Sequence, residues 1–277
     1  MQRLSGIFLC FTFFVCSTTL YSQRTDNYTG KSFIKYFPDT SLAEFVANLL
    51  HKQITDYVTI KELAGIKGDF DIGVVPVTNL TGIGYLTGID SFHCYKNEVT
   101  AIPAEIGNLR NLIYLDLCKA FELRKIPTDI GKLTKLKKIR LCLTEVNEIP
   151  KEIGNLTNLE ILWICCNELT EIPKEIGQLK KLKDLDIHSN ELHQIPAEIC
   201  NLTSLKYLDL SYCGLEKLPV NIGNLKNLKS LNLFNNDIKS LPNTIAELDN
   251  LSYLNVFDNF KLSESYKRYL PVLLRKK

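Results

Sequence analysis

The fold is decided by the stretch Leu179-Lys-Lys-Leu182-Lys-Asp-Leu185-Asp-Ile187-His-Ser-Asn190-Glu-Leu192-His-Gln-Ile195-Pro196, whose spacing recurs along the 277 residues. Each copy ends in a proline that follows Ile or Leu. These prolines stand at positions 103, 127, 150, 173, 196, 219 and 242. The first interval is 24 residues and each later one is 23 residues. A period of this length predicts a solenoid, in which stacked coils share one core.

Each repeat contains two segments with different structural preferences. Leu-x-Leu predicts a short strand, because alternate residues of a strand face the same side. Pro-x-Glu-Ile-Gly predicts one helical or 3₁₀ turn on the opposite side, with proline at the first helical position. We therefore predict an α/β fold: a right-handed, curved solenoid of eight coils, the last incomplete, whose parallel sheet forms the concave face.

A polar position recurs after the strands. It is held by Asn97, Asn167, Asn190, Asn236 and Asn259. Such a side chain is expected to turn inward and bond backbone groups that a tight bend leaves unpaired. Thr144 and Cys213 replace it in two coils, and Ala120 replaces it in the 24-residue coil. The extra residue of that coil is expected to bulge between Cys118 and Leu123.

Residues 1–22 have the pattern of a secretory signal peptide. A weakly basic start precedes the apolar run from Leu4 to Val15, and Ser22 precedes the expected cleavage site. The run is short for a bilayer span. An uncleaved anchor and a lipoprotein modified at Cys16 are the alternatives. We expect export and a secreted, periplasmic or cell-surface location.

Residues 23–80 depart from the repeat and predict a leader and a helical cap. Ser41-Leu-Ala-Glu44 and Thr59-Ile-Lys-Glu62 are capping-box sequences, each before a short apolar run. Two helices here would cover the open end of the first coil, which a solenoid needs. The repeats are assigned to 81–262, and 263–277 are predicted to form a C-terminal cap and a basic tail.

Several segments carry a family resemblance. They are Phe37-Pro38-Asp39, Leu42-Ala43-Glu44, Thr55-Asp56, Val58-Thr59 and the run from Leu80 to Thr87. These resemble the N-terminal cap of bacterial internalin-type leucine-rich repeat proteins, although internalins commonly use 22-residue repeats. The later Ile-Pro-x-Glu-Ile-Gly-Asn-Leu copies are similar to 23-residue repeats of bacterial surface proteins and of plant intracellular Ras-group proteins. Over residues 33–262 the resemblance implies a bacterial leucine-rich repeat solenoid that binds proteins.

The sequence gives no support to an enzyme. It has no Gly-x-Gly-x-x-Gly, no complete phosphate-binding loop, no His-Glu-x-x-His and no Gly-x-Ser-x-Gly. No cofactor is expected. The formal net charge of +2 gives no reason to expect a nucleic acid partner. We expect a monomer without a membrane span after signal cleavage, binding a host or envelope protein. A structural scaffold of the envelope and a glycan-binding module are the alternatives.

Residues between the inward leucines face the concave side, so they are the candidates for contact with a partner. The selected positions are Tyr95, Tyr114, Arg140, Trp163, Asp186, His188, Asp209, Phe234 and Phe257. Aromatic residues and arginine dominate binding hot spots, because they bury a large area at low entropic cost. The alternative is that the rings stack on one another and stiffen the sheet.

Trp163 is the sharpest candidate. It lies in the fourth coil, with Arg140 and Asp186 in the same column one coil away on either side. Its side chain is expected to point into the groove as a solvent-facing anchor, so that its truncation lowers affinity but barely alters stability. The alternative is a tryptophan packed on its neighbours for stability alone.

The cysteines follow the repeat. Cys118, Cys142 and Cys165 share one column in adjacent coils, beside Cys166 and His188. We favour unpaired thiols that fill a small, semi-apolar column, and no metal is expected. A disulfide is an alternative, although parallel side chains point the same way and closure would need twist. A zinc or copper site is the other alternative.

Overall fold

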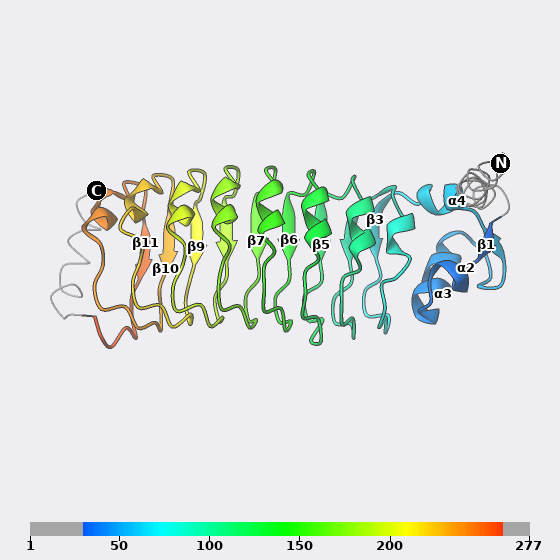
Figure 1. Cartoon of the computed structure of the whole chain (residues 1–277), viewed down its shortest axis with the longest axis horizontal. Helices are drawn as coiled ribbons and strands as arrows, with labels where there is room; N and C mark the ends of the chain where they lie inside the picture. The colour runs from blue at the N-terminus through cyan, green and yellow to red at the C-terminus, as the bar shows by residue number, and fades with distance from the viewer. Residues whose placement is uncertain (1–29, 263–277) are drawn as a thin grey trace, which may run out of the picture.

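The computed structural model describes residues 30–262, which form a long stack of coils with a small helical unit at its N-terminal end (Figure 1). The signal peptide predicted at 1–22 and the C-terminal cap predicted at 263–277 lie outside the described residues. Between residues 30 and 262, no helix has both the length and the apolar character that a bilayer crossing requires.

A parallel sheet of nine strands runs along one side of the described stack, with its strands in sequence order. The strands are β3 Gly68–Asp71, β4 Ile89–His93, β5 Tyr114–Asp116, β6 Lys138–Arg140, β7 Ile161–Trp163, β8 Asp184–Asp186, β9 Tyr207–Asp209, β10 Ser230–Asn232 and β11 Tyr253–Asn255. Equivalent residues of successive repeats pair, as Ile161 does with Asp184. The predicted leucine-rich repeat solenoid is confirmed, with β3 as a strand that the repeat pattern does not contain.

Short 3₁₀ turns line the opposite side of each coil (Figure 1). They are η1 Ile83–Tyr85, η2 Ala104–Asn108, η3 Thr128–Lys132, η4 Lys151–Asn155, η5 Lys174–Gln178, η6 Ala197–Asn201, η7 Ile222–Asn224 and η8 Asn243–Glu247. The core lies between these turns and the sheet. Leu156, Leu159 and Leu162 of one coil are fully buried, and their equivalents in the neighbouring coils complete the same layer.

The proline of the repeat does not occupy the first helical position, so that prediction is wrong. In η4, Pro150 is the N-cap, with φ −65° and ψ 144°, and its carbonyl accepts from Ile153 N at 3.0 Å. An N-cap residue keeps an extended ψ, and proline's fixed φ suits that conformation equally well. Close stacking of the turns explains the recurring glycine, since a Cβ on Gly154 would lie 2.8 Å from the carbonyl oxygen of Glu175.

The recurring asparagines turn inward, as predicted. Asn190 Nδ2 donates to the carbonyl oxygens of Ile164 and Ile187 at 2.9 Å each, and its Oδ1 accepts from Leu169 N at 3.0 Å. One side chain therefore ties its own coil to the preceding one. In one of the three coils that lack this asparagine, Cys213 Sγ donates to the same Ile187 oxygen at 3.3 Å.

The bulge of the 24-residue coil lies where it was expected. Ala120 is buried at the position of the repeat asparagine, and Phe121 then projects into solvent. Leu123 returns to the core. The extra residue is absorbed between two fixed core positions, so the following strand keeps its register.

The N-terminal unit contains α2 Phe33–Tyr36, α3 Thr40–Leu49 and α4 Ile60–Ala64, with β1 Lys31–Ser32 antiparallel to β2 Tyr57–Val58. The capping box at Thr59 is confirmed: Glu62 N donates to Thr59 Oγ1 at 3.2 Å, and Thr59 N donates to Glu62 Oε2 at 2.7 Å. The box predicted at Ser41 is wrong. Asp39 caps α3 instead, accepting from Leu42 N at 2.9 Å, so the helix starts two residues earlier than predicted.

The helical unit packs directly onto the end of the sheet. Strand β3 lies within the segment assigned to the cap, and its Phe70 is the point of contact. The ring of Phe70 lies 5.4 Å from that of Phe45 in α3 and 5.8 Å from that of Phe92 in β4, measured between centroids. The sheet therefore continues into the cap instead of ending against it.

Candidate functional site

The outward side of the sheet is built by simple alternation along each strand. In β7, Leu162 is fully buried, whereas Ile161 and Trp163 point outward and are half-buried. Because the strands are in register, equivalent outward residues form straight columns across the coils. We call the outward side chains of β4–β11, with the residues just after each strand, the sheet face. The predicted column of Arg140, Trp163 and Asp186 is confirmed by the pairing, which extends it from His93 to Asn255.

A hollow of about 450 Å³ opens on the N-terminal half of the sheet face. It is lined by His93, Tyr95, Lys96, Tyr114, Asp116, Cys118, Lys119 and Arg140. Asp116 is 4% exposed, and its carboxylate is the charged centre of the hollow. Arg140 Nη1 donates to Asp116 Oδ2 at 2.8 Å, and the Tyr114 hydroxyl donates to the same oxygen at 3.0 Å.

Both oxygens of the Asp116 carboxylate accept hydrogen bonds. The other oxygen, Asp116 Oδ1, accepts from Cys118 N at 3.0 Å, and Arg140 Nη1 also reaches the Tyr114 hydroxyl at 3.2 Å. Burial raises the pKa of Tyr114, the Arg140 guanidinium opposes this, and the Asp116 charge adds to it. The phenol therefore stays protonated and keeps its role as donor. Three hydrogen bonds thus hold the Asp116 carboxylate in place at the floor of the hollow.

Trp163 points outward, as predicted, but it is less exposed than the sequence suggested. Its side chain is half-buried, with Lys138 Nζ 5.0 Å and Arg140 Cζ 5.2 Å from its ring centroid. The indole Nε1 is buried. Burial raises the pKa of Asp184, while the interaction with the indole of Trp163 lowers it. Trp163 therefore lies between Lys138 and Arg140 of β6 on one side and Asp184 of β8 on the other. Part of its side chain remains exposed to solvent.

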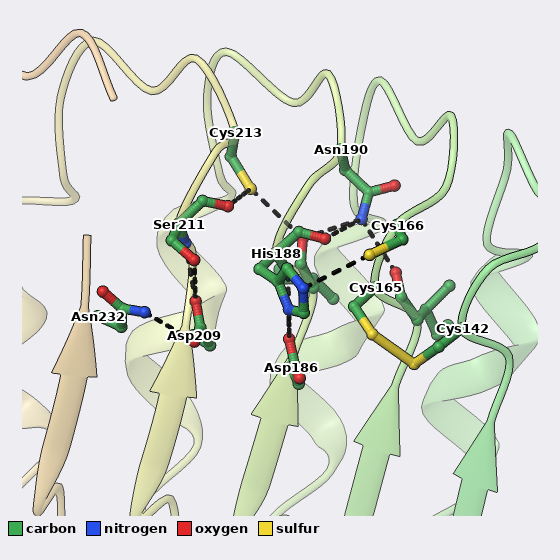
Figure 2. Close-up of polar contacts among 12 residues, drawn as sticks. Cys142, Cys165, Cys166, Asp186, His188, Asn190, Asp209, Ser211, Cys213 and Asn232 are labelled. Carbon is green, nitrogen blue, oxygen red and sulfur yellow. Dashed lines mark hydrogen bonds and ion pairs between the residues drawn. A yellow bond between two sulfur atoms is a disulfide. The ribbon is translucent and has the colours of Figure 1, made fainter. Parts of the chain in front are cut away.

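A second polar cluster lies on the following coils (Figure 2). His188 Nδ1 lies 2.6 Å from Asp186 Oδ1, and His188 Nε2 lies 3.5 Å from Cys166 Sγ. The Asp186 hydrogen bond raises the pKa of His188, and burial opposes that shift. Next to them, Asp209 accepts from Ser211 Oγ at 2.6 Å and from Asn232 Nδ2 at 2.8 Å. This half of the sheet face is acidic, in contrast to the cationic side chains around Trp163.

Cys142 and Cys165 form a disulfide between β6 and β7 coils, visible at the edge of the cluster in Figure 2. The expectation of unpaired thiols is wrong for these two residues. Their Cα atoms lie 4.7 Å apart, within the range that a disulfide needs. Cys118, Cys166, Cys94, Cys200 and Cys213 are free among the described residues.

Two groups of side chains bring possible cation ligands within 4.8 Å of one another: Cys165 with Cys166 and His188, and Asp186 with His188 and Asp209. The disulfide already engages the Cys165 sulfur. In the second group, Asp186 and His188 bond each other, and Asp209 bonds Ser211 and Asn232. The side chains of both groups therefore satisfy one another without a cation.

The C-terminal part of the sheet face carries exposed aromatic side chains. Tyr207 is 47%, Tyr253 is 50% and Phe257 is 73% exposed. Phe234 packs edge-on against Tyr212, with ring centroids 5.2 Å apart. Exposed rings of this kind contribute little to the core and are available for contact with another molecule.

The nine predicted residues fall into three groups along one face. Tyr95, Tyr114 and Arg140 line the hollow, with Trp163 packed on Arg140. Asp186, His188 and Asp209 form the polar cluster. Phe234 and Phe257 lie in the aromatic region. The sequence selection missed four residues that organise these groups: Asp116, Lys138, Asp184 and Cys166. Asp116 could have been selected, because its charge is opposite to that of Arg140 in the same column on the neighbouring strand, and such charges pair across a sheet.

Comparison with known proteins identifies the family. A model of the leucine-rich repeat region matches residues 76–196 and 190–269, and this chain belongs to the leucine-rich repeat family. It is 30% identical to a leucine-rich repeat protein of Leptospira interrogans, with a TM-score of 0.64. That match covers 78% of this chain and 61% of the other, so this chain spans less than two thirds of that protein.

Two further solved structures show the same architecture. Internalin C2 from Listeria monocytogenes is 25% identical, with a TM-score of 0.66, over 82% of this chain and 97% of its own. The ectodomain of the plant receptor kinase GASSHO1/SCHENGEN3 from Arabidopsis thaliana, solved in complex with CASPARIAN STRIP INTEGRITY FACTOR 2, is 29% identical, with a TM-score of 0.56. That match covers 69% of this chain and 22% of the receptor ectodomain. These folds are repeat scaffolds, and the family match points to no enzyme class.

Proposed function

We propose that this chain is an exported leucine-rich repeat module that recognises a protein partner through its sheet face. The observation that carries the proposal is the set of exposed rings on that face, Tyr207, Tyr253 and Phe257, which the core does not use. They lie next to Asp186, His188 and Asp209, whose side chains bond within their own cluster. A rigid polar surface beside exposed aromatic anchors is the usual composition of a protein interface.

The relatives support a binding role. The plant receptor ectodomain was solved with a bound factor, and that likeness favours recognition of a protein or peptide here. Export rests on the signal-peptide pattern of residues 1–22 and on the similarity to internalin C2. We further propose that the cap is of the internalin type and that the protein is bacterial and monomeric. Its partner would be a protein of a host or of the cell envelope.

Site-specific photo-crosslinking tests the proposal. A photoreactive phenylalanine analogue is placed at Tyr207 on β9, or at Val220 on the opposite side of the coil just before η7. Both positions are well exposed, at 47% and 70%, so neither replacement disturbs the core. The protein is expressed with its leader and irradiated at the surface where it accumulates, and the adducts are identified by mass spectrometry.

The proposal expects one predominant protein adduct from Tyr207 and none from Val220. Several weak adducts from both positions would instead support a scaffold of the envelope. A specific adduct from Val220 alone would contradict a binding site on the sheet face.

A further inference from the structure

Cys166 lies in a setting that none of the other free thiols shares among the described residues. Its Sγ is 3.5 Å from His188 Nε2, and His188 Nδ1 is 2.6 Å from Asp186 Oδ1. Figure 2 shows the imidazole of His188 between the other two side chains, with Asp186 at one ring nitrogen and Cys166 at the other. A thiol, an imidazole and a carboxylate in this order are the groups that activate a cysteine nucleophile.

The hydrogen bonds fix how the imidazole acts. A carboxylate only accepts, so His188 Nδ1 donates to Asp186 Oδ1, and Nε2 of the neutral ring is left to accept from the thiol of Cys166. His188 N also donates to Asp186 Oδ1 at 3.2 Å, which holds the carboxylate in place. The Asp186 hydrogen bond raises the pKa of His188, which makes the ring a better proton acceptor.

The fold does not require a cysteine at position 166. The residue follows β7 in a left-handed conformation, with φ 55°. Its equivalents in the other coils are Lys96, Lys119, Leu143, Ser189, Tyr212, Asn235 and Asp258, all with φ between 50° and 63°. These side chains have nothing in common, so the turn is set by the backbone. Cys166 is partly exposed, and its contact with His188 is specific to this coil.

The remaining free thiols are chemically protected. Burial raises the pKa of Cys94 and Cys213 to about 12, and that of Cys118 and Cys200 to about 11. The thiolate is the reactive form of cysteine, so these four are inert near neutral pH. A reagent that requires a thiolate therefore has one favoured target among the described cysteines.

We propose that Cys166, His188 and Asp186 form a reactive thiol site at which a low-molecular-weight disulfide is captured by thiol–disulfide exchange. This goes beyond partner binding and does not depend on it. The acceptor is an external disulfide, because the nearby Cys142–Cys165 bond is badly placed for exchange. Consecutive Cα atoms are about 3.8 Å apart, which is shorter than the ~4.4–6.8 Å that a disulfide spans, so a Cys165–Cys166 bond would be strained.

The step balances without any further reagent. His188 Nε2 takes the proton of the Cys166 thiol, and the thiolate attacks one sulfur of the external disulfide. The Cys166–sulfur bond forms as the external sulfur–sulfur bond breaks. The leaving thiolate takes the proton from His188. Cys166 is thereby oxidised to a mixed disulfide, and one half of the external disulfide is reduced to a thiol.

The test uses 2,2′-dithiodipyridine, a neutral disulfide that Asp186 and Asp209 do not repel. The full chain is mixed with the reagent near pH 7, the released pyridine-2-thione is followed by absorbance, and the modified peptide is identified by mass spectrometry. We expect the Cys166 peptide to be modified first, and His188→Gln to slow that reaction at least about tenfold. His193→Gln is the matched control, since His193 is exposed and makes no contact with Cys166, and it should leave the rate unchanged.

Solvent exposure alone would also make the Cys166 thiol react. The variants distinguish that explanation from activation of the thiol by His188. An equal Cys166 rate in the native chain and in folded His188→Gln would overturn the proposal, as would earlier modification of Cys94, Cys118, Cys200 or Cys213. If His188→Gln does not fold, Asp186→Asn decides the matter. It keeps the size of the side chain but removes the charge that orients the ring, and an unchanged rate in this variant would equally refute the site.

Discussion

At the scale of single residues, Asp116 and Arg140 form one ion pair but differ in how far each side chain is buried. The Asp116 side chain is 6% exposed, whereas that of Arg140 is 34% exposed. Removing the guanidinium leaves a buried carboxylate without its charge partner, whereas removing the carboxylate leaves a guanidinium that water can reach. The cost of breaking the pair therefore depends on which partner is lost.

We predict that Arg140→Leu lowers the free energy of unfolding by about 2–3 kcal/mol. Asp116→Asn in the same background should recover part of that loss, because the amide removes the uncompensated charge. Urea denaturation of the two variants measures both values. Lys183→Leu is the control, since its pair with Glu160 is exposed and should be worth less than ~1 kcal/mol. If the double variant is less stable than Arg140→Leu alone, the assignment of Asp116 as a buried charge is wrong.

Trp163 has a structural role as well as an exposed edge. With Lys138 and Arg140 both about 5 Å from the ring, we expect Trp163→Ala to cost about 1–2 kcal/mol of stability. Tyr253→Ala, at a site 50% exposed, should cost less than ~0.5 kcal/mol. Thermal melts of the two variants provide the comparison. Equal melting temperatures would show that the packing around the indole contributes nothing.

At the scale of the element, the inward asparagine links neighbouring coils through hydrogen bonds. Asn190→Ala leaves Leu169 N and several carbonyl oxygens without their partner, so we expect a loss of about 1–3 kcal/mol. Cys213→Asn is the reciprocal change, because it restores the repeat residue in a coil that lacks it. It should be neutral or stabilising in the same denaturation experiment. Native stability of Asn190→Ala would show that these hydrogen bonds do not stabilise the stack.

The cap contains a pH-sensitive element. The hydrogen bond from Lys52, with those from Thr59, lowers the pKa of Glu62 to about 2 from an ordinary 4.5. The carboxylate therefore stabilises the cap above pH 4.5, and this contribution disappears as the pH falls toward 2. Glu62→Gln should melt below the native protein at pH 7, and the difference should shrink steadily below pH 4.5. Glu44→Gln, at an exposed position in α3, is the control. A melting difference that stays constant with pH would contradict the role of the Glu62 charge.

Elements that depend on local pattern could be predicted from the sequence. The 23-residue spacing of Leu185 and its equivalents located the strands, and Asn190 was placed correctly because only one inward polar position exists in each coil. Strand β3 was missed because Gly68-Asp-Phe-Asp71 carries one apolar residue and pairs only through its neighbour β4. The start of α3 was misplaced because Ser41 and Asp39 are both acceptable N-cap residues, and helix ends are decided by tertiary contacts.

The site was predictable as a surface but not as a set of contacts. Register alone placed Arg140, Trp163 and Asp186 in one column. Repeat spacing placed Cys142 and Cys165 side by side but did not decide whether the two thiols bond. The approach of Cys166 to His188 depended on a left-handed residue that aims a side chain from one coil toward the next. The repeat therefore placed these residues on adjacent coils but did not decide which of their side chains bond.

At the scale of the whole molecule, each coil contacts mainly its neighbours, so stability accumulates along the stack. The helical unit protects one end through Phe45, Phe70 and Phe92. This arrangement keeps the strands in register over the full length of the sheet. It therefore presents the hollow, the acidic cluster and the aromatic region as fixed parts of one surface, which a partner can contact together.

The affinity of the crosslinked partner for a chain carrying both Tyr207→Ala and Tyr253→Ala tests the central claim most directly. Both side chains are exposed, so the double variant should melt like the native protein. The account predicts that affinity, measured by titration calorimetry, falls by about 2 kcal/mol, roughly thirtyfold. Val220→Ala on the opposite side should bind normally. Native affinity in the double variant, together with weakened binding in Val220→Ala, would contradict recognition through the sheet face.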